Sequence, residues 1–127
     1  MRYIVQIKTA QEPLAGTDAR VFLTLNGDAA SLREVEFTDP KDTNPFEPGD
    51  LNSEVFETSQ DLGEIVSGQL REDGANFDPN WKVEWVRIIR EADGREWTAS
   101  VNTWSRLGTR SGVFPLLRFV RTFDGGA

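Results

Sequence analysis

Two strictly alternating segments near the N-terminus constrain the fold more than any other feature of this chain. Each places apolar side chains at every second position, first at Tyr3, Val5 and Ile7 and then at Val21, Leu23 and Leu25. A period of two is typical of a β-strand with one buried face. The second segment ends at Asn26-Gly27, a strong turn signal. The pattern predicts two strands that contribute to one apolar core.

Between these segments lies an oxygen-rich glycine turn, Ala15-Gly16-Thr17-Asp18-Ala19-Arg20-Val21. Gly16 can turn its carbonyl outward, and Thr17 and Asp18 add side-chain oxygens. A strand, an oxygen-rich turn and a second strand can together form a hard-cation site at the edge of a β-sandwich. The arrangement favours a binding module over an active site.

Turn signals recur about every ten residues along the chain, and no segment shows sustained helical spacing. We therefore expect an all-β fold, an eight-stranded antiparallel β-sandwich. A short helix around Ser31–Glu36 is a less favoured alternative to a strand there. We expect one domain over residues 1–123 and a short flexible tail over 124–127. The predicted strands are Arg2–Thr9, Arg20–Asn26, Arg33–Thr38, Glu54–Gln60, Gly63–Glu72, Trp81–Arg90, Arg95–Val101 and Val113–Phe123.

The composition excludes several kinds of chemistry. The chain of 127 residues contains no histidine and no cysteine. Their absence removes Ser-His-Asp and Cys-His catalysis, the usual zinc sites and any disulfide framework. No paired carboxylates stand out as a catalytic set, so we expect no enzyme activity. Met1 leads directly into a strand, so we expect a soluble chain with no signal peptide, either free or peripheral to a membrane; its compartment is left open.

Charge is unevenly distributed along the chain. The net charge of −7 argues against nucleic acid as a partner, because phosphate binding needs a basic surface. From Glu34 to Glu64, acidic residues outnumber bases by ten to one, Lys41 being the single base. Two interpretations stay open: a solvated acidic face, or a region that collects divalent cations. The segment Asp39–Ser53 also predicts a long irregular loop, a kind of segment that is often functional.

Three loops offer the oxygen ligands that calcium prefers. They are Gly16-Thr17-Asp18, then Asp42-Thr43-Asn44-Pro45-Phe46-Glu47, and then Asp78-Pro79-Asn80. None has the spacing of an EF-hand loop. The alternative is that these side chains form Asx turns and strand caps.

The large apolar residues fall into two groups. Trp81, Trp85 and Trp97 lie in or beside predicted strands, and we expect them in the core. Leu14, Phe77 and Trp104 lie at predicted loop positions. An aromatic ring there can insert at a lipid interface or can anchor its loop by burial.

The order of these motifs resembles the PLAT domain, also called the lipoxygenase homology domain, over roughly residues 2–107. The residues that carry the resemblance are Tyr3-x-Val5-x-Ile7-x-Thr9, Ala15-Gly16-Thr17-Asp18-Ala19-x-Val21, Phe46-Glu47-x-Gly49, Leu62-Gly63-Glu64-Ile65 and Trp81-x-Val83, followed by Trp97 and Trp104. The resemblance implies an eight-stranded sandwich attached to lipases, lipoxygenases or membrane proteins. There it supports calcium-aided membrane association or protein docking and does no chemistry itself.

The resemblance also implies roles for individual residues. Gly16 and Asp18 match the first calcium loop, Asn44 and Glu47 the second, and Asn80 a third ligand position beside Asp78. Leu14 and Trp104 match apolar membrane-tip positions, with Phe77 as a further candidate. Four positions depart from the family pattern, because charged or aromatic residues expected there are replaced by Ala19, Pro45, Asn76 and Asn80. Loss of charged ligands lowers calcium affinity.

Two hypotheses of function follow. The first is a membrane-surface lipid-binding module with a calcium-supported loop edge. The second is a protein-docking module that positions a partner without lipid or calcium, for which arginines such as Arg106, Arg110, Arg118 and Arg121 offer a surface. A sugar-binding sandwich would need a planar row of exposed aromatic side chains, which the sequence does not clearly supply.

Overall fold

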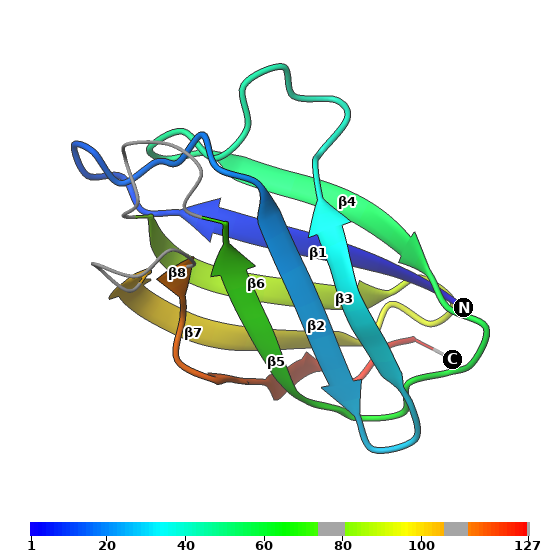
Figure 1. Ribbon diagram of the computed structural model, residues 1–127. Coiled ribbons are helices and arrows are strands. Elements are labelled where there is room, and N and C mark those ends of the chain that lie inside the picture. The colour runs from blue at the N-terminus through cyan, green and yellow to red at the C-terminus, as the bar shows by residue number, and fades with distance from the viewer. Residues whose placement is uncertain (74–80, 106–111, 127) are drawn as a thin grey trace.

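The computed structural model describes residues 1–73, 81–105 and 112–126, and it forms two packed antiparallel sheets (Figure 1). The first sheet has the order β10-β7-β6-β1-β4, with bounds Val120–Phe123, Glu96–Trp104, Lys82–Arg90, Arg2–Thr9 and Leu51–Glu57. The second has the order β3-β2-β5-β8, with bounds Ser31–Phe37, Val21–Gly27, Ile65–Glu72 and Gly112–Val113. A short strand β9, Leu117–Arg118, also pairs with β5. The expected all-β sandwich is confirmed, with ten strands in the described residues where eight were expected.

The difference in strand number comes from the C-terminal segment. Val113–Phe123 was expected to be one strand, and that prediction is wrong: β8 and β9 pair with β5, whereas β10 pairs with β7 in the other sheet. Pro115, between β8 and β9, cannot donate a ladder hydrogen bond. Beyond β9 the Phe119 amide donates to the Val66 carbonyl, and its buried ring marks where the chain passes between sheets. Residues Ser31–Glu36, where a helix was the alternative, lie within strand β3.

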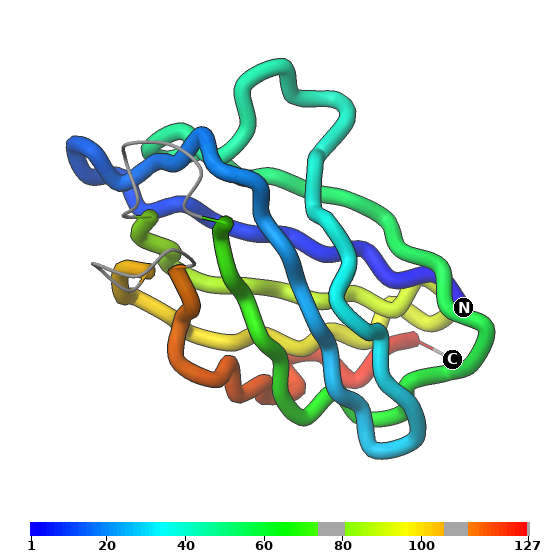
Figure 2. The backbone as a smooth tube through the Cα atoms, viewed as in Figure 1, coloured from blue at the N-terminus to red at the C-terminus, as the bar shows by residue number. Residues whose placement is uncertain are grey.

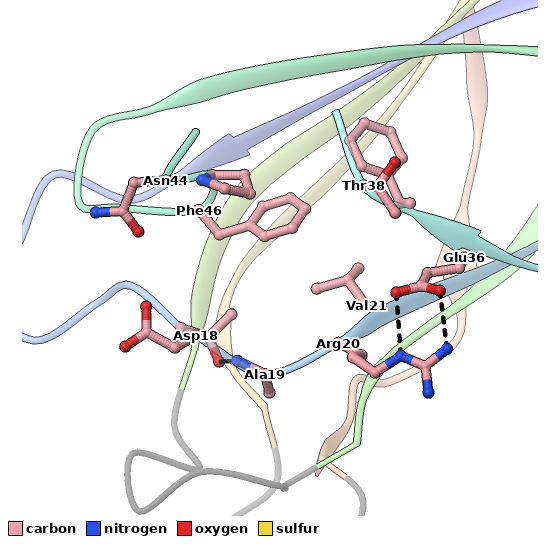
Figure 3. Close-up of a pocket in the computed structure, with 11 residues that line it drawn as sticks. Asp18, Ala19, Arg20, Val21, Glu36, Thr38, Asn44 and Phe46 are labelled. Carbon is pink, nitrogen blue, oxygen red and sulfur yellow. Dashed lines mark hydrogen bonds and ion pairs between the residues drawn. The ribbon is translucent and has the colours of Figure 1, made fainter. Parts of the chain in front are cut away.

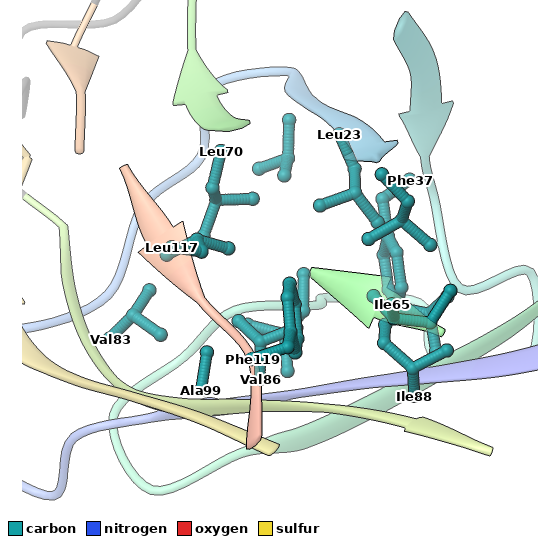
Figure 4. Close-up of a cluster of buried hydrophobic side chains, with 14 of the residues drawn as sticks. Leu23, Phe37, Ile65, Leu70, Val83, Val86, Ile88, Ala99, Leu117 and Phe119 are labelled. Carbon is teal, nitrogen blue, oxygen red and sulfur yellow. The ribbon is translucent and has the colours of Figure 1, made fainter. Parts of the chain in front are cut away.

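Alternation in the strands produces the core as predicted. Tyr3, Val5 and Ile7 of β1 are completely buried, as are Leu23 and Leu25 of β2. These side chains lie between the sheets with residues such as Leu70, Val86 and Ile88 (Figure 4). Burial of each such side chain contributes about 1.5–3 kcal/mol. The core is therefore a continuous layer between the two sheets.

Of the three tryptophans expected in the core, two are buried there and one is not. Trp81 and Trp97 are completely buried, and the Trp81 ring contacts the ring of Phe46 with 5.0 Å between centroids. Trp85, which was expected in the core, is half-buried on the outer face of its sheet, so that prediction is wrong. The Arg87 guanidinium lies over its ring, 4.6 Å from the centroid. The inward positions of this part of β6 are taken by Val83 and Val86, and a register shift separates Val83 from Trp85.

A network of charged side chains closes the end of the sandwich where β1 begins. Arg90 bridges Asp61 and Asp93, and the Tyr3 hydroxyl donates to Asp61. The hydrogen bond from the Arg90 guanidinium lowers the pKa of Asp93. The pKa of Asp61 is lowered mainly by the Gly63 amide, and burial raises the pKa of Tyr3. The network ties the loop before β5 to the β6–β7 hairpin and leaves the other end for the long loops.

Candidate functional site

Two loops meet at the end of the sandwich opposite this network. One joins β1 to β2 and the other joins β3 to β4, and the chain trace brings them to the same region (Figure 2). The Thr17 amide donates to the Phe46 carbonyl at 3.0 Å, and the Gly49 amide donates to the Ala10 carbonyl at 3.2 Å. The structure thus brings together the first two of the three oxygen-rich loops predicted from the sequence.

Gly16 permits this close approach. A β-carbon at this position would lie 2.6 Å from the Phe46 carbonyl oxygen, a distance that real side chains do not show. The sequence singled out Gly16 for a turn that could expose its carbonyl. The structure gives a second reason, since only glycine lets the two loop backbones come this close.

Two adjoining hollows border these loops. The first, of about 180 Å³, is lined by Leu14, Gly16, Thr17, Asp18, Glu47 and Pro48. The second shares Thr17 and Asp18 and extends to Asn44 and Phe46, with Asn44 and Asp18 on opposite loops (Figure 3). Four predicted ligands, Gly16, Asp18, Asn44 and Glu47, therefore lie around one small region. The other two, Asp78 and Asn80, lie outside the described residues.

A buried amide, Asn52, shapes the β3–β4 loop. Its Oδ1 accepts a hydrogen bond from the Phe46 amide at 2.9 Å. Its Nδ2 donates to Asp39 Oδ2 at 2.9 Å and to Asp42 Oδ2 at 2.8 Å. Asn52 is completely buried, and Phe46 has a left-handed φ of 66°. The amide thus holds Phe46 in the conformation that presents its carbonyl to Thr17.

Sequence reasoning did not identify Asn52 as a site residue. In the sequence, Asn52 is only a polar residue shortly after Gly49-Asp50. It stands out as a polar residue at an inward position only when the start of β4 is known. Of its two partner acids, Asp39 was counted in the acidic block and Asp42 also in the second oxygen-rich loop, but neither was linked to Asn52.

Several acids of that block hold the loop together. Asp39 Oδ2 also accepts from the Ser53 amide at 3.0 Å, and Glu54 Oε1 accepts from the Thr38 and Asp39 amides at 2.7 and 2.9 Å. Asp50 accepts from the Glu47 amide. A turn of this kind was the alternative for the oxygen-rich loops, and in the second of them Asp42 Oδ1 accepts a hydrogen bond from the Asn44 amide at 3.0 Å.

The remaining oxygen donors form a sparse set. Asp18 is exposed and Glu47 is half-buried, and the Asn44 side-chain amide donates to Glu47 Oε1. Within residues 1–73, 81–105 and 112–126 no group of three or more acidic, histidine or cysteine side chains could together hold a metal ion. Carboxylate, carbonyl and amide oxygens are the ligand types that a hard cation such as calcium prefers, and this set supplies only two carboxylates.

The apolar tip residues can be placed in part. Leu14 is 80% exposed at the tip of the β1–β2 loop, with a left-handed φ of 65°. Trp104 ends β7 and is half-buried. The Lys82 ammonium lies 5.8 Å from its ring centroid and also pairs with Glu12 of the β1–β2 loop, so Trp104 lies at the same end as Leu14. Phe77 lies outside the described residues. Among the described residues no helix is long and apolar enough to cross a membrane.

Comparison with known proteins assigns this architecture to a family. The model of the PLAT/LH2 domain matches residues 3–111. The mouse lipoxygenase homology domain-containing protein 1 is 32% identical over 124 residues, which cover 97% of this chain and 6% of that protein. The chain thus spans only a small fraction of that relative.

Solved structures agree with this assignment. The coral 8R-lipoxygenase structure superposes with a TM-score of 0.77 at 24% identity, covering 94% of this chain and 17% of that one. A calcium-dependent 11R-lipoxygenase superposes with a TM-score of 0.62 at 26% identity, covering 94% and 17%. Fold, motif order and family match all agree, and the chain belongs to the PLAT/LH2 domain family.

Proposed function

We propose that this chain is a non-catalytic module that binds a membrane lipid surface through its β1–β2 loop, with assistance from calcium. The observation that carries the proposal is Leu14, an almost fully exposed leucine held in a left-handed conformation directly beside the hollow lined by Asp18 and Glu47. An apolar tip beside oxygen ligands lets one loop contact both acyl chains and a cation that bridges to lipid headgroups.

Calcium assistance is supported by charge and by similarity. A chain with a net charge of −7 is repelled by anionic lipid, and a cation bound at the tip would neutralise part of that repulsion. The coral 8R-lipoxygenase is described as activated by calcium through a C2-like domain, and the 11R-lipoxygenase as calcium-dependent. The ligands proposed here are Gly16, Asp18, Asn44 and Glu47, with Asp78 and Asn80 completing the set from the third loop.

A thermal-shift titration tests the calcium site. A ligand that binds only the native state raises its melting temperature, so calcium in excess over EDTA is expected to stabilise the chain. Glu47→Ala is expected to remove most of the shift, while Glu57→Ala, an exposed glutamate on β4, retains it. An identical melting temperature in calcium and in EDTA would refute the site.

Flotation with vesicles of phosphatidylcholine and phosphatidylserine tests the membrane contact. Insertion of one leucine contributes about 1.5–3 kcal/mol, which gives modest and reversible binding. Leu14→Ala is expected to reduce the bound fraction strongly, and Leu14→Ala with Trp104→Ala to abolish it. Leu116→Ala is the control, because this leucine is likewise exposed, at 49% against 80% for Leu14, but lies between β8 and β9. Equal binding by all four proteins would contradict insertion of the loop.

The absence of catalysis is part of the same proposal. No histidine or cysteine is present, so a histidine base and a cysteine nucleophile are lacking, and no paired carboxylates stand out as a catalytic set. The isolated chain is expected to hydrolyse no lipid ester and to oxygenate no polyunsaturated fatty acid. Turnover by the purified chain, lost on substitution of one of its own carboxylates, would overturn this part of the proposal.

Protein docking is the second candidate. The observation that favours it is Trp104, whose ring is half-buried beneath Lys82 and so adds less apolar surface at the tip than a free loop tryptophan would. Of the arginines considered for docking, Arg118 is exposed, Arg121 pairs with Glu64 and Asp124, and Arg106 and Arg110 lie outside the described residues. Absence of vesicle binding both with and without calcium would favour docking over membrane association.

A further inference from the structure

A groove beside β4 is used by neither proposed function. β4 is the outermost strand of its sheet, and the β3–β4 loop projects past its edge (Figure 1). The groove has a volume of about 580 Å³, against about 180 and 210 Å³ for the two hollows at the loop end. Sites for small molecules commonly measure about 300–1,000 Å³. The size of the groove therefore suits a small organic ligand.

The floor of this groove is apolar and lies on the outer face of the sheet. Ile4 alternates with the buried residues of β1 and pairs with Val55 of β4, so both side chains face outward. Leu51 of β4 lines the same groove. Leu51 is 50% exposed and Val55 is 43% exposed. These side chains form an apolar surface across two strands, and an aliphatic chain that covers it is removed from water.

The two acids that line the groove are hydrogen-bonded inside the protein. Asp39 is buried, and its Oδ2 accepts from Asn52 Nδ2 at 2.9 Å and from the Ser53 amide at 3.0 Å. Glu54 Oε1 accepts from the Thr38 and Asp39 amides at 2.7 and 2.9 Å. Both carboxylates thus have protein donors against their charge, and neither is directed at a cationic ligand.

Two ammonium groups beside the groove have no carboxylate partner among the described residues. Lys41 lines the groove and is exposed. Lys8 lies directly opposite Leu51 in the β1–β4 pairing, and its ammonium donates to the Gly49 carbonyl at 2.7 Å. An ammonium group carries three donors, so Lys8 retains donors for a further acceptor. The cations of this region are thus available to a ligand, whereas its acids are engaged.

The charges are distributed unequally along the groove. Lys41 is next in sequence to Asp42, which accepts from Asn52, the neighbour of Leu51. Both ammonium groups therefore lie toward the Leu51 end. At the other end of the floor, the exposed Glu57 shares the outer face. An anionic group is attracted to the first end and repelled from the second, which gives a ligand one orientation.

We infer that this groove binds a single aliphatic carboxylate, such as a free fatty acid. The carboxylate pairs with the Lys41 and Lys8 ammonium groups. The chain covers Leu51, Ile4 and Val55 and points toward the other end of β4. Apolar walls with a few placed polar groups are typical of small-molecule sites. This site lies along the side of the sheet, and it requires a free carboxylate but neither calcium nor a membrane surface.

Amide NMR titrations with decanoate, decanol and decylamine test the inference, because these ligands share one chain and differ in the charge of the head group. The titrations are made in EDTA, without vesicles and below micelle-forming concentrations. Decanoate is expected to bind most tightly, with an affinity that falls as salt is raised, and decylamine most weakly. Shifts are expected to concentrate at Ile4, Lys41, Leu51 and Val55. Decanol or decylamine binding as tightly as decanoate would refute the charge argument.

Two matched pairs of variants separate the head group from the chain. Lys41→Gln is expected to weaken decanoate about two- to fivefold and to leave decanol unchanged. Its control is Arg118→Gln, which removes an exposed positive charge from β9 and is expected to leave both affinities unchanged. Val55→Glu is expected to weaken decanoate and decanol about tenfold or more. Its control is Val66→Glu, at a valine that is 54% exposed on β5 of the other sheet. Equal losses within either pair would refute the assignment.

Other occupants of the groove would give different results with the unmodified chain. No shifts with decanoate, or shifts concentrated on the other sheet, would overturn the proposal and leave a segment of a partner protein as the occupant. Shifts at the same amides with phosphatidylcholine vesicles alone would overturn it in favour of membrane lipid. A dimer seen by sedimentation without ligand, and lost in Val55→Glu, would overturn it in favour of a second copy.

Discussion

Replacement of Asn52 tests the role of the amide that shapes the β3–β4 loop. In Asn52→Ala the buried Phe46 amide loses its acceptor, and Asp39 and Asp42 each lose one donor. An unsatisfied buried group costs about 1–3 kcal/mol. The two carboxylates keep their backbone donors, so each loss there is nearer ~0.5–1 kcal/mol. The sum is about 3 kcal/mol, or roughly 10 °C in melting temperature for a domain of this size.

The variant Asn52→Asp is a second test of the same buried amide. It preserves shape and the acceptor for Phe46 but places a third carboxylate beside Asp39 and Asp42. Burial and two negative neighbours raise the pKa of the new acid, so its charged form destabilises the fold more as pH rises. Asn52→Asp is therefore expected to be less stable than the unmodified chain at about pH 7. This deficit in unfolding free energy should become smaller as the pH falls to about 5, because the new acid becomes protonated.

Urea unfolding followed by tryptophan fluorescence measures both variants. Asn44→Ala is the control, since it removes an exposed amide of the same loop and is expected to cost less than about 0.5 kcal/mol. A loss below about 1 kcal/mol for Asn52→Ala, or an Asn52→Asp deficit that does not change with pH, would refute the reasoning.

Further predictions concern backbone approach, the core and pH. Gly16→Ala is expected to cost about 1–3 kcal/mol because its β-carbon meets the Phe46 carbonyl, whereas Gly126→Ala, which meets nothing, should be neutral in the same urea titration. Trp81→Ala should cost about 3–5 kcal/mol or prevent folding. Trp85→Ala on the outer face should cost about 1 kcal/mol, and similar losses for both would contradict the core described here. Because the pKa of Asp93 is lowered in the folded state, its carboxylate stabilises the fold above the unfolded pKa of about 4. This stabilisation is lost progressively as the pH falls from there toward the lower folded pKa. Asp93→Asn should therefore reduce the acid dependence of the urea midpoint between about pH 5 and pH 2, and an unchanged profile would argue against the Arg90 pair.

The sheets could be predicted because their signal is local. In β1 and β2 the alternation of apolar side chains alone identifies the buried face, and the turn at Asn26-Gly27 lies where β2 ends. The prediction of one continuous C-terminal strand was wrong because the buried residues there do not alternate. Phe114, Leu117 and Phe119 are spaced by three and then by two positions. That spacing reflects a crossing between sheets, which depends on partners distant in sequence.

The candidate site was predictable only in outline. Asp18 and Glu47 were identified as oxygen ligands on loops, and both line one hollow. The reason for Gly16, the close approach of the Phe46 carbonyl, requires contact across thirty residues of sequence, and no local pattern encodes it. Asn52 was not predicted as a site residue for the same reason, since its partners Asp39, Asp42 and Phe46 come from other parts of the loop. Trp85 was wrongly predicted to be in the core because a tryptophan in a strand can face either side of the sheet. The register shift between Val83 and Trp85 places it on the outer face.

A spin label at the loop tip tests the central claim most directly. The chain has no cysteine, so Leu14→Cys offers a single site for a nitroxide, with Val120→Cys on β10 as an exposed control. Electron paramagnetic resonance with lipid-soluble and water-soluble relaxants reports whether each label enters the bilayer. With phosphatidylserine-containing vesicles and calcium, the label at position 14 is expected to become accessible from the lipid and protected from water, and to return to water in EDTA, while the label at position 120 stays in water throughout. A label at position 14 that remains in water with calcium and vesicles present would contradict the proposed function.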